Sequence, residues 1–274
     1  MANAIVVGAV MYDPKVSVIW DIIKGFFKAE GCPIDCLFYS TYELQVDALV
    51  EGRIDIAWNS PLAWIDAERR TKRTCRPLAM RDTDRDRVTH VIVRGESGIR
   101  SVEDLRNKTV ALGAKDSPQA TLLPVHYLRQ HGLIAGHDFV PQRHDVLVGK
   151  HGDHIGGERE ALRALETARS DAAAVLDLNW EAWQPDGTAD PHRLRVLSST
   201  PKFDHCNFTA LDRFPSERAQ HWTDVLFRMR YDNPAHREMM DLEGLKSWLP
   251  GRTSGYAALA AAVEEQQFFE AATK

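Results

Sequence analysis

The sequence contains no apolar run long enough to cross a membrane. A membrane-spanning helix needs about 20 consecutive apolar residues, and no stretch of the 274 residues approaches that length. The N-terminal segment also lacks the basic residues that open a secretory signal, and its apolar run stops before Asp13 and Pro14. We therefore expect no direct membrane insertion, and a cytoplasmic protein as the sequence is written. If Met1 is not the native start, the periplasm is the alternative.

An excess of charge of one sign is also missing. The chain has 34 Lys and Arg against 39 Asp and Glu, a formal net charge of −5, and no block of like charges. Because binding to a nucleic-acid backbone depends on basic patches, the composition argues against a nucleic-acid partner. Any anion that binds must be held by local groups.

Cysteine is scarce. The four cysteines, Cys32, Cys36, Cys75 and Cys206, are too few and too scattered for a disulfide framework. Three residues separate Cys32 from Cys36, which is not the usual C-x-x-C spacing of zinc and redox sites. We expect four reduced thiols, no bound metal and no cofactor.

Short apolar strands alternate with amphipathic helices along the chain. This alternation predicts an α/β fold in which mainly parallel sheets are flanked by helices. A second α/β series begins near Gly95, so two lobes are expected. The strands expected first are Ala4 to Val10, Ile34 to Tyr39 and Ile54 to Trp58, with helices from Val16, Tyr42 and Pro61.

Three further segments carry specific expectations. The polar segment from Arg81 to Arg87 alternates in charge sign and predicts a solvated turn. The segment from His144 to Val148 is expected to be a strand. The chain from Ser216 to Lys274 has little strand signal and is expected to be helical.

Three segments, in order, resemble the phosphate/phosphonate solute-binding proteins of ABC transporters. They are Glu51 to Ile65 with its Asn59-Ser60-Pro61 turn, Gly98 to Pro124 with Asp116-Ser117-Pro118-Gln119-Ala120-Thr121, and Glu160 to Asp177. The second is common to many type II periplasmic-binding-protein folds, whereas the two turns are more specific.

The resemblance implies a two-lobed type II clamp that binds a small anionic molecule between its lobes. Lobe one would comprise residues 1–87 plus 206–274 and lobe two residues 94–198, with hinge strands near 88–94 and 198–208. The ligand would be phosphonate-like or phosphate-like. If the protein is exported, an ABC transporter membrane complex would be its partner.

Physical chemistry points to the same turns. A helix N-terminus has unpaired N–H groups and a partial positive charge, so it can bind an oxyanion without a basic protein. Asn59 and Ser60 precede one helix, and Ser117, Gln119 and Thr121 open another. Their hydroxyl and amide groups can donate to such oxygens. The alternative is that Ser60 and Ser117 are ordinary helix caps.

Further candidates lie near these turns. Tyr12 and Trp58 could wall the organic part of a ligand, although core packing explains Trp58 nearly as well. The resemblance implies that Asp177, after the last strand of lobe two, contacts an amine or a protonated oxygen. It also implies an anion-contacting His in the loop of residues 148–158, where both His151 and His154 are candidates. We favour His154 because Gly156 and Gly157 follow it directly.

Two other interpretations remain at the sequence level. His151, Asp153 and His154, with His144 nearby, could hold a metal, but such sites need three or four convergent ligands. The chain could also be an intracellular biosynthetic or decarboxylase-like enzyme on the same fold, using His154, His151 or Cys206. A direct pair of His205 with Cys206 is disfavoured because adjacent strand residues point to opposite faces, which favours a buried structural cysteine.

Overall fold

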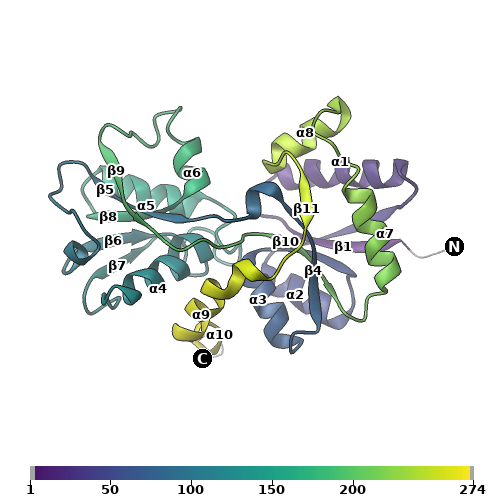
Figure 1. Cartoon of the computed structure of the whole chain (residues 1–274), viewed down its shortest axis with the longest axis horizontal. Helices are drawn as coiled ribbons and strands as arrows, with labels where there is room; N and C mark the ends of the chain where they lie inside the picture. The colour runs from purple at the N-terminus through teal and green to yellow at the C-terminus, as the bar shows by residue number, and fades with distance from the viewer. Residues whose placement is uncertain (1–3, 272–274) are drawn as a thin grey trace. The chain divides into compact units, whose positions relative to one another are not determined.

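A computed structural model describes residues 4–271, and their contacts divide the chain into two units (Figure 1). Unit 1 comprises Met1–Arg85 and Asp204–Gly255, and unit 2 comprises Asp86–Phe203 and Tyr256–Lys274. Each unit has one sheet with helices on both faces. No helix among the described residues has the length and apolar character that crossing a membrane requires.

Unit 1 is built on a six-stranded sheet. Its strand order is β11 (Trp248–Pro250), β4 (Cys75–Arg81), β10 (Asn207–Leu211), β3 (Ile56–Asn59), β1 (Ile5–Val10) and β2 (Ile34–Tyr39). The helices are α1 (Lys15–Ala29), α2 (Tyr42–Glu51), α3 (Pro61–Arg70), α7 (Ser216–Leu226) and α8 (Pro234–Glu243), with a short 3₁₀ turn η1 (Asp82–Asp84).

Side-chain alternation along β1 separates the two cores of unit 1. Val7 and Ala9 join an aromatic-rich cluster that contains Trp20 of α1 and Trp222 of α7. Val10 points to the opposite face and joins a cluster with residues of α2 and α3. This period of two is the property of a strand that is covered on both faces.

Unit 2 is built on a five-stranded sheet. Its order is β7 (Val140–Arg143), β6 (Thr109–Leu112), β8 (Ala172–Leu176), β5 (Thr89–Arg94) and β9 (Leu194–Ser199). The helical elements are η2 (Glu103–Leu105), the π-helical turn η3 (Pro118–Leu122), α4 (Leu123–Gln130), α5 (Gly156–Glu166), α6 (Asp177–Ala182), α9 (Ala257–Glu265) and α10 (Phe268–Ala271). A 3₁₀ turn, η4 (Ser254–Tyr256), lies at the boundary of the units.

Both sheets are mixed, which corrects the expectation of mainly parallel sheets. In unit 1, β1 is parallel to β2 and β3, but β10 is antiparallel to both β3 and β4. In unit 2, β6 is parallel to β7 and β8, whereas β5 is antiparallel to β8 and β9. The predicted βα repeats account for the parallel pairs only. The antiparallel strands follow from long-range returns of the chain.

Three local expectations were wrong. The segment expected as a solvated turn contains Asp84, which is 1% exposed, because Arg81 neutralises its carboxylate. The strand expected at His144 to Val148 lies earlier in the chain, at β7. This strand is at the edge of the sheet, where Pro141 is tolerated because its missing N–H group is not needed for pairing. The C-terminal region also contains a strand, β11, which pairs antiparallel with β4.

The C-terminal helices are grouped with unit 2, whereas lobe one had been expected to include them. Gln266 Nε2 of this region donates to the Leu122 carbonyl oxygen at 2.9 Å. Glu265 Oε2 lies 3.2 Å from His126 Nδ1 of α4. Polar contacts that no local pattern indicates therefore fix this segment on η3 and α4.

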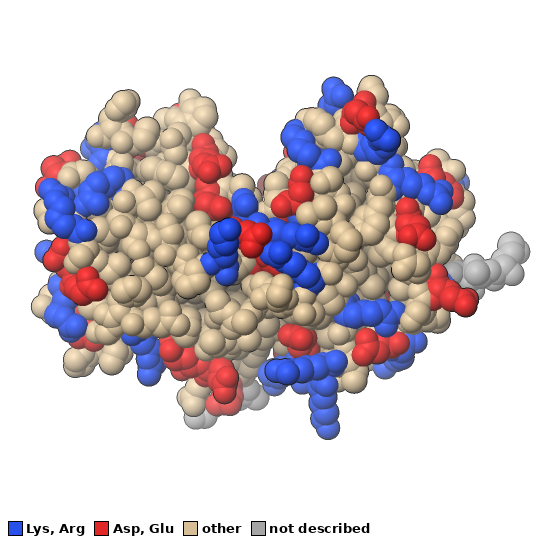
Figure 2. Space-filling model, in the orientation of Figure 1, with Lys and Arg blue, Asp and Glu red and all other residues tan. Residues whose placement is uncertain are grey.

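Charges of both signs are interspersed over the visible surface (Figure 2). This mixture agrees with the small net charge of −5. An anion must therefore be recognised by the local geometry of its site and not by a surface of one charge sign.

Candidate ligand-binding site

Two loops of unit 1 meet at one edge of its sheet. The strands β1 and β3 are parallel neighbours, so the turns that follow them share the carboxyl edge. Tyr12 lies in the turn after β1, and Ser60 directly follows β3. Ligands of open α/β sheets bind outside this edge.

Ser60 caps α3, a ten-residue helix that begins with Pro61. The Ser60 Oγ accepts a hydrogen bond from the Ala63 N–H at 3.1 Å, and the residue is fully buried. A serine hydroxyl can both accept and donate hydrogen bonds, so its role as a cap does not by itself exclude other contacts. Pro61 at the first helical position lacks an N–H group and sacrifices no helical hydrogen bond there.

Asn59 is part of a buried amide network. Its Oδ1 accepts from Gln45 Nε2 at 2.9 Å, and its Nδ2 donates to Thr209 Oγ1 at 3.0 Å. Gln45 Nε2 also donates to the Trp58 carbonyl oxygen at 2.8 Å. These bonds fix the end of β3 immediately before Ser60.

Trp58 packs into the core of unit 1. It is 5% exposed, and its ring centroid lies 4.5 Å from that of Phe208. The Arg81 guanidinium carbon lies 5.3 Å from the centroid of the same ring. Tyr12 is half-buried and packs against the same cluster. The core-packing explanation of Trp58 accounts for all of these contacts.

Three loops of unit 2 share an edge in the same way. The strands β7, β6 and β8 are consecutive parallel neighbours. The turn that contains Ser117 follows β6, the glycine-rich loop with His151 and His154 follows β7, and Asp177 follows β8. The fold therefore places three predicted regions at one carboxyl edge.

Ser117 and Gln119 pack directly against the glycine-rich loop. The Ser117 Oγ accepts from the Ala120 N–H at 3.1 Å, and Gln119 Nε2 donates to the Gly152 carbonyl oxygen at 3.1 Å. Both residues are at most 2% exposed, and Gln119 Oε1 has no hydrogen-bond partner within the described chain. A Cβ atom on Gly152, which has φ +80°, would overlap the Ser117 hydroxyl. Only glycine allows this close approach.

Two carboxylates that the sequence did not single out hold these loops. Asp116 Oδ2 accepts from the Gly149 N–H at 2.6 Å and from the His151 N–H at 3.3 Å. Glu158 Oε1 accepts from the Leu176 N–H at 2.6 Å and from Asn179 Nδ2 at 3.0 Å. No local sequence pattern indicates these partners, which lie 18 to 35 residues away.

The two loop histidines have different environments. His151 is 3% exposed and has φ +50°, and its backbone N–H donates a hydrogen bond to Asp116. His154 is half-buried, and its Nδ1 accepts from the Gly156 N–H at 3.2 Å. Because Nδ1 accepts, the neutral ring carries its proton on Nε2, where it can donate to an anion.

Asp177 is already paired with a cation. Its Oδ2 lies 3.5 Å from Arg87 Nη1, and its Oδ1 accepts from the Leu178 N–H at 2.9 Å. This pairing offsets the repulsion that a carboxylate would exert on an anionic ligand.

Thr121 has a different setting from Ser117 and Gln119. It lines a separate cavity of unit 2, and neither of those two residues is part of that cavity's wall. The predicted group of Ser117, Gln119 and Thr121 is thus divided by the structure.

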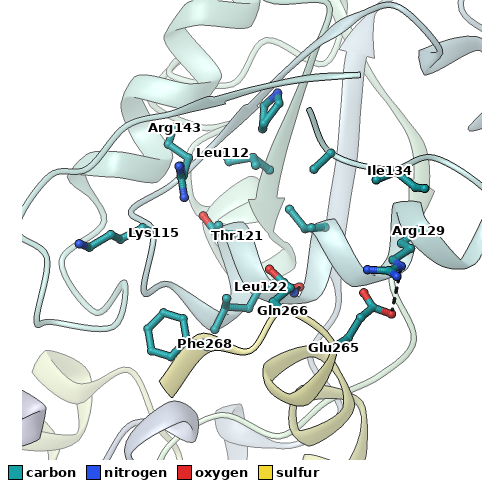
Figure 3. A pocket seen from close by; sticks show the side chains of 13 residues that line it. Leu112, Lys115, Thr121, Leu122, Arg129, Ile134, Arg143, Glu265, Gln266 and Phe268 are labelled. Carbon is teal, nitrogen blue, oxygen red and sulfur yellow. Dashed lines mark hydrogen bonds and ion pairs between the residues drawn. The ribbon is translucent and has the colours of Figure 1, made fainter. Parts of the chain in front are cut away.

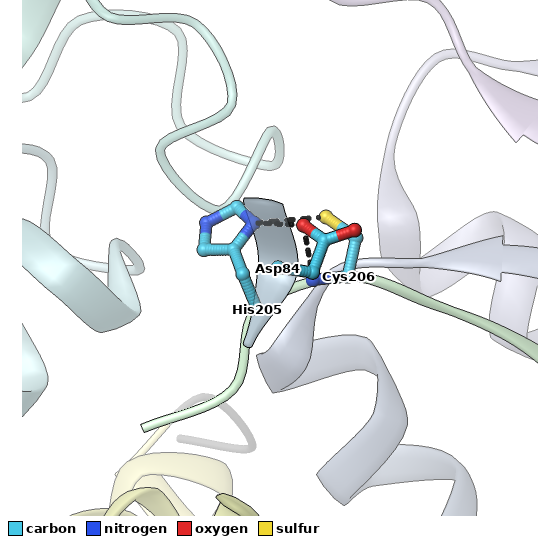
Figure 4. A group of neighbouring side chains, drawn as sticks. All are labelled: Asp84, His205 and Cys206. Atoms are coloured by element: carbon cyan, nitrogen blue, oxygen red, sulfur yellow. Dashed lines mark hydrogen bonds and ion pairs between the residues drawn. The ribbon is translucent and has the colours of Figure 1, made fainter. Parts of the chain in front are cut away.

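Cys206 and His205 do contact each other, contrary to the argument from strand alternation. The Cys206 Sγ lies 3.1 Å from His205 Nδ1, and Asp84 Oδ1 lies 3.6 Å from the same nitrogen (Figure 4). The alternation rule fails because β10 begins only at Asn207. Since both contacts use one ring nitrogen, the imidazole cannot relay a proton from the thiol to the carboxylate through its two nitrogens.

The described residues contain one group of three side chains that could together hold a metal ion. The group is Asp84, His205 and Cys206, whose possible ligand atoms all lie within 4.8 Å of one another. The Arg81 guanidinium already pairs with the Asp84 carboxylate. Its Nε and Nη2 donate hydrogen bonds to the two carboxylate oxygens at 2.8 and 2.7 Å. Burial alone would raise the pKa of Asp84, but Arg81, with a smaller contribution from His205, outweighs burial and lowers the pKa to about 2. A guanidinium in this place opposes a second cation. The loop histidines form no such group in the described chain.

The fold matches that of solved periplasmic binding proteins. PhnD1 from Prochlorococcus marinus, solved with methylphosphonate, has a TM-score of 0.72 at 16% identity, with 96% of this chain and 98% of that chain covered. A Xanthomonas citri protein solved with ATP also has a TM-score of 0.72, at 17% identity, covering 97% of this chain and 98% of its own. The aliphatic sulphonate-binding protein SsuA from Escherichia coli has a TM-score of 0.63 at 18% identity, covering 98% and 94%. These likenesses define a type II periplasmic-binding-protein fold.

The family model for the phosphonate periplasmic substrate-binding proteins of ABC transporters matches residues 26–256, and the chain belongs to that family. An uncharacterised protein of Haemophilus influenzae is 58% identical over 36 residues, which are 13% of this chain. The chain spans about half the length, 51%, of that curated relative.

Proposed function

We propose that the protein is a solute-binding component that captures a small phosphonate-like or phosphate-like oxyanion. The observation that carries the proposal is the Ser60-capped N-terminus of α3, placed at the carboxyl edge of a sheet in a chain of this family. Backbone N–H groups and a serine hydroxyl suit a ligand whose oxygens accept hydrogen bonds.

Unit 2, taken by itself, offers a second group of polar side chains that suit an oxyanion. Ser117, Gln119 and His154 are the donors that its carboxyl edge offers, and Gly152 brings the loop against the first two. The Arg87 partner of Asp177 supports the same assignment because it reduces local negative charge. Asp177 itself suits an amine or a protonated oxygen on the ligand.

The names of the relatives support this ligand class. One was solved with methylphosphonate, one with ATP, and one is named for aliphatic sulphonates. All three molecules carry a tetrahedral oxyanion. We propose an ABC transporter complex as the partner and the periplasm as the compartment, which fractionation of native cells would test.

Calorimetry with methylphosphonate, inorganic phosphate and methanesulfonate tests the site. Ser60→Ala removes one hydrogen bond to a charged ligand, so we expect affinity to fall by roughly 10- to 150-fold, equivalent to about 1.5–3 kcal/mol. It also removes a helix cap, which costs about 1 kcal/mol of stability.

Thr41→Ala is the matched control because Thr41 caps α2 in the same unit and accepts from the Leu44 N–H at 3.4 Å. It should lower stability similarly and leave affinity unchanged. Equal affinities in wild type and Ser60→Ala would contradict the assignment of Ser60.

A further inference from the structure

Unit 2 contains a cavity of about 550 Å³ that the proposed oxyanion site does not use (Figure 3). Its wall is formed by β6, η3, α4, the β7 edge and the C-terminal helices α9 and α10. The volume lies within the range of small-molecule sites, roughly 300–1,000 Å³.

Most of the wall is apolar. Leu112 and Leu122 are at most 2% exposed and form the buried side. Phe268 contributes an aromatic ring from α10, and Val125 and Pro141 add aliphatic surface. Such a wall favours the apolar body of a ligand.

A buried hydroxyl also lines the cavity. Thr121 is 4% exposed, and its Oγ1 has no hydrogen-bond partner among the residues that the structure describes. A buried polar atom without a partner is unfavourable and uncommon in folded proteins. An oxygen of a bound ligand would satisfy the Thr121 hydroxyl.

Positive charge exceeds negative charge around the cavity. Of the charged lining residues, Lys115, Arg129 and Arg143 are cationic and Glu265 is anionic. Glu265 Oε2 already lies 3.8 Å from Arg129 Nε and 3.2 Å from His126 Nδ1. Arg143 has no ion pair within the described part of the chain, and Figure 3 shows its guanidinium on the same side of the cavity as Thr121.

We propose that this cavity binds an amphipathic organic anion, with its apolar body against Leu122, Val125 and Phe268 and its oxyanion at Arg143 and Thr121. Arg143 offers several N–H donors in a planar fork, which suits carboxylate and phosphate groups. Lys115, which extends outward in Figure 3, adds longer-range attraction.

Decanoate is the probe because it combines one carboxylate with an apolar chain. We expect calorimetry to show one decanoate per chain, with weaker binding of acetate, which lacks the chain, and of decanol, which lacks the charge. Arg143→Gln should reduce decanoate affinity by about tenfold or more while decanol affinity stays the same.

Two variants complete the test. Val125→Phe should fill the apolar space and weaken both decanoate and decanol. Arg163→Gln is the matched control, since this exposed arginine of α5 does not line the cavity, and it should change neither affinity.

Competition separates this cavity from the proposed oxyanion site. Saturating methylphosphonate should leave decanoate affinity unchanged if the two sites are distinct. Displacement of decanoate by methylphosphonate would overturn the proposal. So would equal decanoate affinities in wild type and Arg143→Gln, or the absence of decanoate binding up to about 1 mM, a concentration that corresponds to roughly −4 kcal/mol.

Discussion

Replacing Asp84 by Asn should destabilise unit 1 through one buried ion pair. Asp84 accepts from Arg81 Nε and Nη2, from the Arg81 N–H at 2.9 Å and from the Cys206 N–H at 3.2 Å. Asparagine preserves the size but removes the charge and replaces one acceptor by a donor. Arg81 would then keep only its second carboxylate partner, Glu243, at 2.9 Å.

The magnitude of this loss follows from the buried ion pair and from the pKa shift of Asp84. Removing one partner of a buried ion pair costs about 3–5 kcal/mol, and the remaining Glu243 contact favours the lower end. The pKa of Asp84 falls from 3.8 to about 2, which corresponds to about 2 kcal/mol of stability from ionisation. We expect Asp84→Asn to lose about 2–3 kcal/mol at pH 7.

The sign of the pH dependence follows from the same shift. Because folding lowers the pKa of Asp84, its ionisation stabilises the fold above about pH 4, and this contribution is lost as the pH falls toward 2. The difference in unfolding free energy between wild type and Asp84→Asn should therefore shrink between these pH values.

Urea unfolding followed by tryptophan fluorescence measures this effect. Five of the seven tryptophans lie in unit 1, so the signal reports mainly on that unit. Asp47→Asn is the control, because Asp47 pairs with Arg70 at 2.7 Å but its side chain is 40% exposed; it should cost less than about 1 kcal/mol. A loss below about 1 kcal/mol for Asp84→Asn, or a difference that is constant from pH 5 to pH 2, would refute the reasoning.

Two further substitutions test the loops that position the site. Gly152→Ala should weaken methylphosphonate binding by about tenfold or more because its Cβ would displace Ser117, whereas Gly136→Ala, with a similar φ of +79° and open space around it, should alter only stability. Equal affinities of these two variants in calorimetry would count against the loop contact. Gln45→Leu should cost about 1–3 kcal/mol in urea unfolding because it leaves the buried Asn59 Oδ1 without its donor. An unchanged unfolding midpoint would argue against the amide network.

The local βα pattern of the sequence predicted most of the helices and strands. Apolar spacing from Val16 to Phe27 predicted α1, and the Ser60-Pro61 turn predicted the start of α3. These features depend on residues close in sequence, so periodicity and capping rules can detect them.

The errors share a physical cause, which is partners distant in sequence. The segment around Asp84 looked solvated because two of the groups that hold it lie far away in sequence. The Cys206 N–H donates to Asp84 from 122 residues away, and Glu243 pairs with Arg81 from 162 residues away. The strand β11 is short and contains Pro250, and only pairing with β4 makes it a strand. The C-terminal helices likewise join unit 2 through Gln266 and Leu122.

The candidate site was predictable in part. The sequence located the turns at Ser60 and Ser117, because a serine before a Pro-initiated helix is a local signal. It did not reveal that Thr121 lines a separate cavity, or that Asp116 holds the glycine-rich loop. Those features depend on which face of a helical turn meets which loop.

Equilibrium binding of methylphosphonate to the wild-type protein is the most direct test of the central claim. We predict a dissociation constant of about 10 μM or tighter, equivalent to roughly −7 kcal/mol, and a loss of affinity in Ser60→Ala. Absence of binding for methylphosphonate, phosphate and methanesulfonate alike, at concentrations up to about 1 mM, would contradict the account.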